Sequence, residues 1–187
     1  DIYVVDARTE KGEALMGALA AAPNAAAATL ARREQFWEDA RKLFAKHKLD
    51  CKPEDLPNLL TQACEHLVWE EKSALCFSCG SCTMVCPTCY CFDVQDTWNV
   101  DQQSGARMRH WDACLTEDFA KVSLGAGAAE NFREERGDRF RHRFMRKSAY
   151  LNEKLGGPAC VGCGRCSTAC TADIADPVKV IEQIMKA

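Results

Sequence analysis

The sequence predicts a mainly α-helical protein, and three segments with helical hydrophobic periodicity support this fold class. Residues 30–48 carry apolar side chains at helical spacing, with charged residues between them. Residues 53–71 begin with Pro53-Glu54-Asp55, which favours a helix start, and continue with a stripe of leucines. Residues 177–185 repeat the pattern near the end of the chain. We therefore expect a helix over each of these ranges.

Shorter or less regular elements fill the rest of the chain. We expect, in order, a strand at Ile2–Val5, a helix over 11–22, a short extended piece within Phe92–Val100, a short helix over 117–123 and a long polar helix over 128–155. Gly125-Ala126-Gly127 should end the short helix. Gly156-Gly157-Pro158 should end the long one, and Gly137 is its weakest point.

The composition excludes several classes of protein. Charged residues make up 27% of the chain and hydrophobic residues 47%, and the net charge is −3, so nothing global points to nucleic acid. There is no run of about 18 apolar residues, so we expect no membrane span. The N-terminus lacks the basic and apolar regions of a secretory signal. We therefore expect a cytoplasmic protein.

Cysteine is the outlier, with 13 residues in a chain of 187. A disulfide framework and metal binding are the two explanations. The odd count, the length of the chain and the missing export signal favour metal binding. Eight of the cysteines form two motifs, Cys76-x2-Cys79-x2-Cys82-x3-Cys86-Pro87 and Cys160-x2-Cys163-x2-Cys166-x3-Cys170.

This spacing suits two 4Fe–4S clusters. A cubane needs four thiolates at four iron corners, and three cysteines two residues apart can wrap one cube. Gly80, Gly162 and Gly164 suit such loops, because glycine accepts a positive φ and lets backbone N–H groups approach the sulfurs. Zinc sites use two pairs of ligands and have no need of a third evenly spaced cysteine. Two full motifs therefore predict two 4Fe–4S clusters.

The fourth cysteine of each motif is expected to serve the other cluster. It lies about one helical turn beyond the third and points away from its own loop, as in two-cluster ferredoxins. We assign Cys76, Cys79, Cys82 and Cys170 to cluster 1, and Cys160, Cys163, Cys166 and Cys86 to cluster 2. This exchange would place the cubes side by side and make the metal part of the folding energy.

The 73 residues between Cys86 and Cys160 bear on the fold. Compact ferredoxins join their motifs through short βαβ pieces, so a βαβ core with a large insertion is one alternative. A mainly helical connection, with a helix leading into the first motif, resembles the α-helical ferredoxin domains of respiratory and heterodisulfide-type electron-transfer subunits. We expect residues 29–187 to form such an α-helical ferredoxin-like domain, with its cluster-binding core at 53–187.

Residues 1–28 are expected to be the tail end of an upstream domain, or a linker, with a small α/β segment. The first residue is Asp1 rather than Met. We therefore expect the sequence to begin inside a longer chain.

A narrower resemblance covers about 120 residues, from His66 to the end. It rests on Trp69, the first motif with Thr88-Cys89-Tyr90-Cys91-Phe92, Arg109-His110-Trp111-Asp112-Ala113-Cys114, Asn131-Phe132-Arg133, Arg139–Arg143 and Cys160-Val161-Gly162-Cys163-Gly164-Arg165-Cys166. These residues resemble the iron–sulfur beta subunits of cytoplasmic, sulfhydrogenase-type nickel–iron hydrogenases and the related A subunit of anaerobic sulfite reductase.

The resemblance implies a hetero-oligomeric complex in an anaerobe or facultative anaerobe. In such a complex the subunit relays single electrons between a flavin subunit that handles NAD(P)H and a catalytic subunit. The catalytic partner could be a hydrogenase, a sulfite reductase or another low-potential reductase. No catalytic residue is expected in the relay itself.

Five further cysteines lie outside the two motifs, and we interpret Cys51 and Cys64 as structural. Cys89, Cys91 and Cys114 could pack beside the clusters as small apolar thiols. They could instead form a third metal site or a redox-active thiol pair. The second interpretation defines an alternative function, in which the chain has its own thiol or metal chemistry, such as disulfide, persulfide or sulfite reduction.

Residues 133–147 hold seven basic and three acidic side chains. They could form a solvated helix face, a docking surface for an acidic partner, or a source of positive charge that compensates the anionic clusters. Nucleic-acid binding is disfavoured, because aromatic and basic side chains do not interleave as in a stacking platform. The four histidines show no shared metal-ligand spacing.

Overall fold

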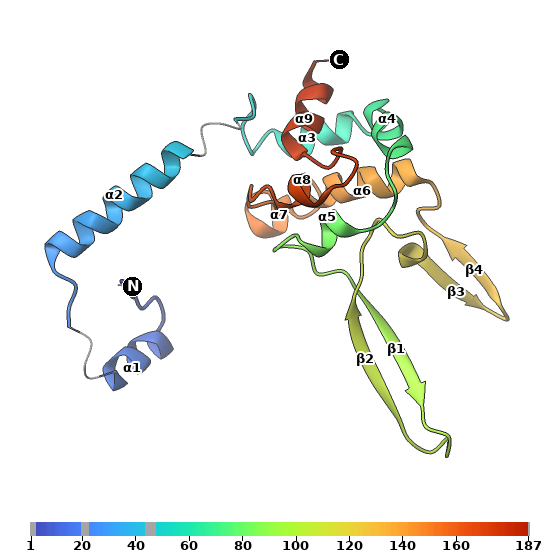
Figure 1. Ribbon diagram of the computed structural model, residues 1–187, viewed down its shortest axis with the longest axis horizontal. Helices are drawn as coiled ribbons and strands as arrows, with labels where there is room; N and C mark the ends of the chain where they lie inside the picture. Colours follow the sequence, from blue (N-terminus) through green and yellow to red (C-terminus); the bar gives the residue numbers. More distant parts are fainter. Residues whose placement is uncertain (1–2, 20–22, 44–47, 187) are drawn as a thin grey trace. The chain divides into compact units, whose positions relative to one another are not determined.

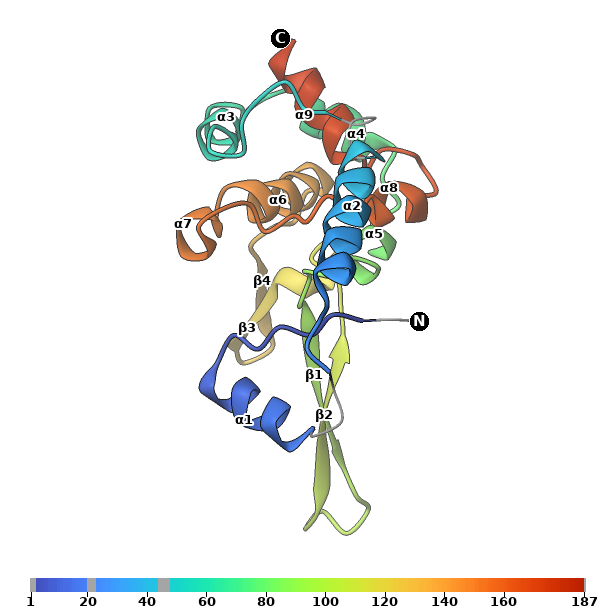
Figure 2. The same cartoon turned by 90° about the vertical axis from the view of Figure 1, so that its left-hand side faces the viewer.

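The computed structural model describes residues 3–19, 23–43 and 48–186. The chain divides into two compact units, residues 1–48 and 49–187. Figures 1 and 2 show the elements of both units. The domain boundary expected after residue 28 stays a prediction.

The first unit contains the helices α1 (Glu10–Ala18) and α2 (Ala27–Leu43), neither of which has a buried residue. Thr9 caps α1, since its Oγ1 accepts a hydrogen bond of 3.1 Å from the Gly12 N–H. The strand predicted at Ile2–Val5 is wrong for residues 3–5, which have no regular secondary structure. Ile2 and parts of both expected helices, at 20–22 and 44–47, lie outside the described residues, whereas Leu19 and Lys48 are described and are not helical.

The second unit is built on four helices: α3 (Leu56–Gln62), α4 (Val68–Ala74), α6 (Arg136–Ser148) and α9 (Pro177–Met185). Helix α6 packs against α3 and α4, and α9 packs against α4. Trp69, Phe140 and Phe144 form the centre of the core. The two phenyl rings lie 5.0 Å apart between centroids, and Trp69 lies 5.8 Å from Phe144. The aromatic triad therefore holds α6, which follows the hairpins, against α4, which precedes the first motif.

The single helix expected over residues 53–71 is interrupted. It consists of α3 and α4, and the chain turns between them. The Trp69 indole N–H donates to the Ala63 carbonyl at 2.7 Å, and the Val68 N–H donates to His66 Nδ1 at 3.0 Å. The turn redirects α4 so that Val68 and Trp69 enter the core, a gain in burial that outweighs the lost helical hydrogen bonds.

Two short helices follow the cysteine loops: α5 (Ser81–Met84) and α8 (Arg165–Ala169), which pack against each other. The long helix expected over 128–155 is interrupted at residues 149–151, so a separate helix, α7 (Asn152–Leu155), follows α6. Helix α7 ends at Gly156, which has the left-handed conformation, so only the expected end is confirmed. The bounds predicted for the last helix are those of α9, which Asp176 caps with a side-chain hydrogen bond to the Val178 N–H.

Two antiparallel hairpins lie between the motifs. Strands β1 (Phe92–Trp98) and β2 (Gly105–Trp111) pair from Phe92 opposite Trp111 to Trp98 opposite Gly105. This hairpin projects from the helices and all its residues are exposed (Figures 1 and 2). The extended piece predicted within Phe92–Val100 is confirmed, and its partner strand was not predicted.

The second hairpin corrects two helix predictions. Strands β3 (Lys121–Gly125) and β4 (Ala128–Asn131) replace the helix expected over 117–123 and the first part of that expected over 128–155. A single 3-10 turn at Asp118–Ala120 precedes β3. Residues 125–127 all have positive φ, so the glycine-rich sequence forms a hairpin turn instead of a helix end.

Every strand among the described residues of the second unit lies between residues 92 and 131, and both sheets are two-stranded and antiparallel. The cysteine motifs are therefore surrounded by helices and loops rather than by βαβ connections. No helix in the described part of the chain is long and apolar enough to cross a membrane.

Candidate iron–sulfur centres

The two cysteine motifs fold alike. In each, a glycine in the left-handed conformation immediately precedes the short helix that carries the third cysteine: Gly80 (φ 73°) before α5 and Gly164 (φ 70°) before α8. Gly162 also has a positive φ, so the conformation expected for all three glycines is confirmed. At Gly80 a side chain is excluded by packing as well, because a Cβ there would lie 2.4 Å from the Ala113 Cβ.

The cysteines assigned to cluster 1 lie together. Cys76, Cys79 and Cys82 of the first motif and Cys170 of the second line one largely apolar cavity, with Phe140 and Ile174 among its walls. Cys170 reaches this cavity because α8 packs against α5. The structure thus brings the last cysteine of one motif to the first three of the other.

The second assigned set comprises Cys86, Cys160, Cys163 and Cys166. Cys160 and Cys163 are exposed, and the other two are half-buried. A pair of hydrogen bonds at Thr88 connects the segment that carries Cys86 with the segment that leads into Cys160. Thr88 Oγ1 donates to the Ala159 carbonyl at 2.7 Å and accepts from Lys147 Nζ at the same distance. This contact holds the segment after Cys86 beside the segment that enters the second motif.

Backbone N–H groups donate hydrogen bonds to the sulfurs of two of these cysteines. The Ser78 N–H donates to Cys76 Sγ at 3.4 Å, and the Ile174 N–H donates to Cys170 Sγ at 3.5 Å. Such N–H···S contacts stabilise sulfur-bound negative charge. The pKa of Cys86 is about 7, because hydrogen bonds, chiefly with Thr88, outweigh the effect of burial. The donor set thus suits cysteine ligands of iron–sulfur clusters.

Two arginines of α6 are buried beside the motifs: Arg139 and Arg143 are 3% and 4% exposed. Burial opposes the charge on Arg143, but the sulfurs of Cys82 and Cys166 raise its pKa and keep it charged. One of these sulfurs belongs to each motif. Within the described residues, no carboxylate pairs with Arg143, and its Nε has no hydrogen-bond partner. A buried cation without a carboxylate needs another anion, and cluster thiolates would supply it.

In the described ranges of the chain, no three Cys, His, Asp or Glu side chains stand as they would around a single metal ion. A cubane differs, since each thiolate binds its own iron corner and the ligands are spread over a larger body. Cys76, Cys79, Cys82 and Cys170, which line one cavity, would supply the four separate thiolates of this second arrangement. The hypothesis of a third metal site at Cys89, Cys91 and Cys114 gains no support from geometry.

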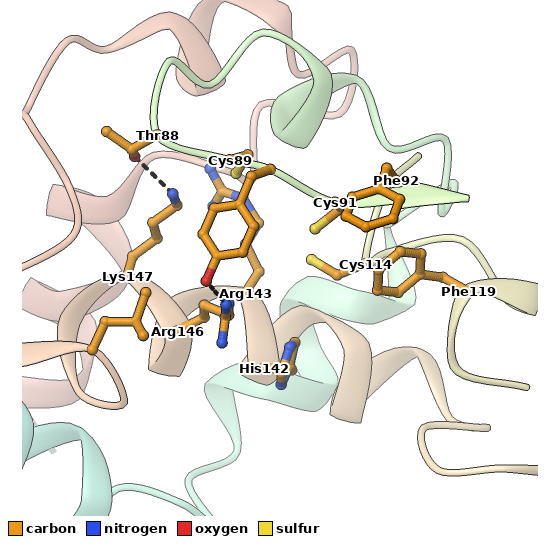
Figure 3. Close-up of a pocket in the computed structure, with 12 residues that line it drawn as sticks. Thr88, Cys89, Cys91, Phe92, Cys114, Phe119, His142, Arg143, Arg146 and Lys147 are labelled. Carbon is orange, nitrogen blue, oxygen red and sulfur yellow. Dashed lines mark hydrogen bonds between the residues drawn. The ribbon is translucent and has the colours of Figure 1, made fainter. Parts of the chain in front are cut away.

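These three cysteines line a separate cavity of about 380 Å³ (Figure 3). Burial and a hydrogen bond with Cys86 help to raise the pKa of Cys89 to about 11. The thiols of Cys91 and Cys114 lie next to each other in this cavity, and each shifts the pKa of the other (Figure 3). The sequence left open packing as small thiols, a third metal site and a redox-active thiol pair. The shared cavity brings Cys91 and Cys114 together as a thiol pair would require.

Sequence reasoning used Arg139–Arg143 and Thr88 only to identify the family resemblance. It assigned no role to Arg139 or Arg143, and it did not predict the contact between Thr88 and Lys147. It considered only the total charge of residues 133–147, including charge compensation for clusters. A signal was present, because Arg139 and Arg143 are four residues apart and each precedes a buried phenylalanine. Two arginines at helical spacing on a core-facing stripe indicate buried cations that need anionic partners.

Comparison with known proteins agrees with this chemistry. The model of the family "4Fe-4S dicluster domain" matches residues 75–174. The chain is also 40% identical over 151 residues to sulfhydrogenase 2 subunit beta of Pyrococcus furiosus, covering 81% of this chain and 42% of that protein. The chain thus spans less than half the length of this relative. No solved structure matches this chain. The resemblance predicted from the motifs is confirmed, and the chain belongs to the 4Fe–4S dicluster domain family.

Proposed function

We propose that this chain is an electron-transfer subunit that relays single electrons through two 4Fe–4S clusters. In this proposal it connects a flavin subunit that uses NAD(P)H with a catalytic subunit, a hydrogenase or another low-potential reductase. The relative in Pyrococcus furiosus is itself named as the beta subunit of a sulfhydrogenase. That name supports a role in a hetero-oligomer, for which we expect a cytoplasmic location.

The observation that carries the proposal is the cavity shared by the two motifs. Cys170 lies with Cys76, Cys79 and Cys82, although 87 residues separate it from Cys82. This grouping supports Cys76, Cys79, Cys82 and Cys170 as ligands of cluster 1, which leaves Cys86 for cluster 2 with Cys160, Cys163 and Cys166. When bound, the clusters accept and release electrons one at a time.

The protein's own residues support this role in two ways. The buried guanidinium of Arg143 lies near sulfurs of both motifs, so it would favour added negative charge at either site. The Thr88–Ala159 hydrogen bond and the packing of α5 on α8 hold the motifs together. Electron transfer between the sites would then need no movement of the chain.

Serine substitution of the fourth cysteines tests the ligand exchange. In the reconstituted protein, Cys170→Ser should impair the cluster held by the first motif, and Cys86→Ser the cluster held by the second. Electron paramagnetic resonance and iron quantification measure the two losses, and Cys64→Ser, which replaces a non-motif thiol, is the matched control. If each substitution instead removes the cluster of its own motif, the ligand exchange is wrong.

The position in the electron pathway is tested in the native complex. We expect purification through this chain to recover a flavoprotein and a catalytic oxidoreductase, and NAD(P)H to reduce the clusters only when the flavoprotein is present. Recovery of the holoprotein alone, or equal reduction without the flavoprotein, would contradict the proposed donor.

A further inference from the structure

Two thiols that the electron relay does not use face each other at the wall of the 380 Å³ cavity (Figure 3). The first hairpin brings them together. Phe92 pairs with Trp111, and the Asp112 N–H continues the pairing by donating to the Cys91 carbonyl at 3.0 Å. The chain then turns and places Cys114 next to Cys91 in the lining of the cavity. Backbone pairing therefore holds the sulfurs close together.

The environments of the two thiols differ. Cys91 is half-buried, whereas Cys114 is 5% exposed and lies behind it, with Thr83 Oγ1 at 3.9 Å from its sulfur. The hydrogen bond from Cys114 lowers the pKa of Cys91 to about 6 against the effect of burial, and Lys147 contributes. The same hydrogen bond and burial raise the pKa of Cys114. A thiolate at the cavity wall with a protonated thiol behind it is the arrangement of an attacking and a resolving cysteine.

The rest of the cavity indicates what could bind there. Arg143, Arg146 and Lys147 line it, and none of its lining residues is acidic. Phe92 and Phe119 add apolar surface. Positive charge next to aromatic rings favours a small ligand that is anionic and partly apolar.

We propose that Cys91 and Cys114 form a dithiol that reduces a small anionic organic disulfide bound in this cavity. The Cys91 thiolate attacks one sulfur of the disulfide, forms a mixed disulfide and releases the first product as a thiolate. Cys114 gives its proton to that thiolate and attacks the Cys91 sulfur. The second product leaves as a thiolate, so the substrate gains two electrons and the two cysteines become a disulfide.

Neither step draws an electron from the clusters, so this inference goes beyond the relay and does not depend on it. It also does not depend on Cys89, whose raised pKa makes it a poor nucleophile. The reaction uses only the two facing thiols and the cavity in front of them.

The test uses the reduced holoprotein and two chromogenic probes, the anionic disulfide dithiobis(nitrobenzoate) and the neutral disulfide dithiodipyridine. In the fast phase the wild-type protein should release about two equivalents of thiol from the anionic probe, and peptide mass spectrometry should locate a Cys91–Cys114 disulfide. Cys114→Ser should release about one equivalent and retain a mixed disulfide on Cys91. Cys91→Ser should slow the fast phase at least ~10-fold. Cys64→Ser is the matched control and should behave as wild type.

The charge of the cavity is tested with Arg146→Met, which should slow the anionic probe severalfold and leave the neutral probe nearly unchanged. Arg141→Met, on the same helix but outside the cavity lining, should change neither rate. Paramagnetic resonance spectra recorded before and after the fast phase should be identical. A fast phase that consumes cluster signal, persists in Cys91→Ser or leaves no Cys91–Cys114 disulfide would overturn the proposal.

Discussion

Replacing Arg143 tests whether the buried cation acts on the clusters. Arg143 is 4% exposed and its charge is supported by sulfurs of Cys82 and Cys166, one from each motif. Methionine has a similar length and no charge, so Arg143→Met removes the cation and keeps much of the packing. Because reduction adds negative charge, we expect both clusters to become harder to reduce.

The size of the effect follows from the charged interaction that the substitution removes. A hydrogen bond to a charged group contributes roughly 1.5–3 kcal/mol. For a one-electron couple this corresponds to reduction potentials lower by about 60–130 mV, since about 1.4 kcal/mol equals 59 mV. Arg143→Lys retains the charge but not the planar fork and should give a smaller shift.

The assay is a redox titration of the holoprotein followed by electron paramagnetic resonance. Arg141→Met is the matched control, because Arg141 lies on the same helix but donates to Asp138 at 2.7 Å and to the Cys64 carbonyl at 2.9 Å. Its potentials should stay within about 20 mV of wild type. If Arg143→Met keeps both clusters and both potentials, the guanidinium does not act on them and its burial needs another explanation.

Three further predictions concern the loop, the core and the thiol pair. Gly80→Ala should strongly reduce the cluster content, because Gly80 has a left-handed φ and the new Cβ would lie 2.4 Å from the Ala113 Cβ. Gly164→Ala meets no atom within 4 Å, so it should lower the free energy of unfolding by only about 1–2 kcal/mol. Iron content and thermal unfolding measure both effects. Phe144→Ala should lower the free energy of unfolding by about 3–5 kcal/mol, because it leaves a cavity beside the aromatic core, which thermal or denaturant unfolding of the holoprotein measures. The alkylation rate of Cys91 should fall only below about pH 6, because its thiolate persists down to the lowered pKa. Cys114→Ala removes the thiol that lowers this pKa, so the pH at which the rate is half-maximal should rise. An unchanged half-maximal pH would refute Cys114 as the cause of the lowered pKa.

The sequence by itself determined the chemistry of the motifs. Cysteine spacing is a local property, since three thiols two residues apart wrap a cubane whatever the rest of the chain does. The positive φ of the loop glycines and the last helix, with proline at its start, are local as well, and both predictions are confirmed. Such features can be predicted from the sequence because they depend only on residues that are close together in the chain.

The helices and strands between the motifs were harder to predict, because their local sequence patterns are weak and distant residues decide their structure. Residues 117–131 form a short segment that is interrupted by Gly125 and Gly127, so no long helical or strand period can be recognised in it. A hairpin forms there because backbone groups pair across the turn at residues 125–127. The break between α3 and α4 likewise depends on Trp69 finding room against Phe140 and Phe144, which lie far away in the sequence.

Only the tertiary structure decided which distant side chains meet. Packing of α5 on α8 brings Cys170 to the first motif, and pairing of β1 with β2 brings Cys91 to Cys114. The burial of Arg143 could not be predicted from the net charge of residues 133–147, because net charge does not show which cations face the core. Contacts of this kind depend on the summed packing of the whole unit, whereas ligand spacing depends on a few bonds. The sequence therefore names the cluster chemistry, and the fold selects the groups that surround it.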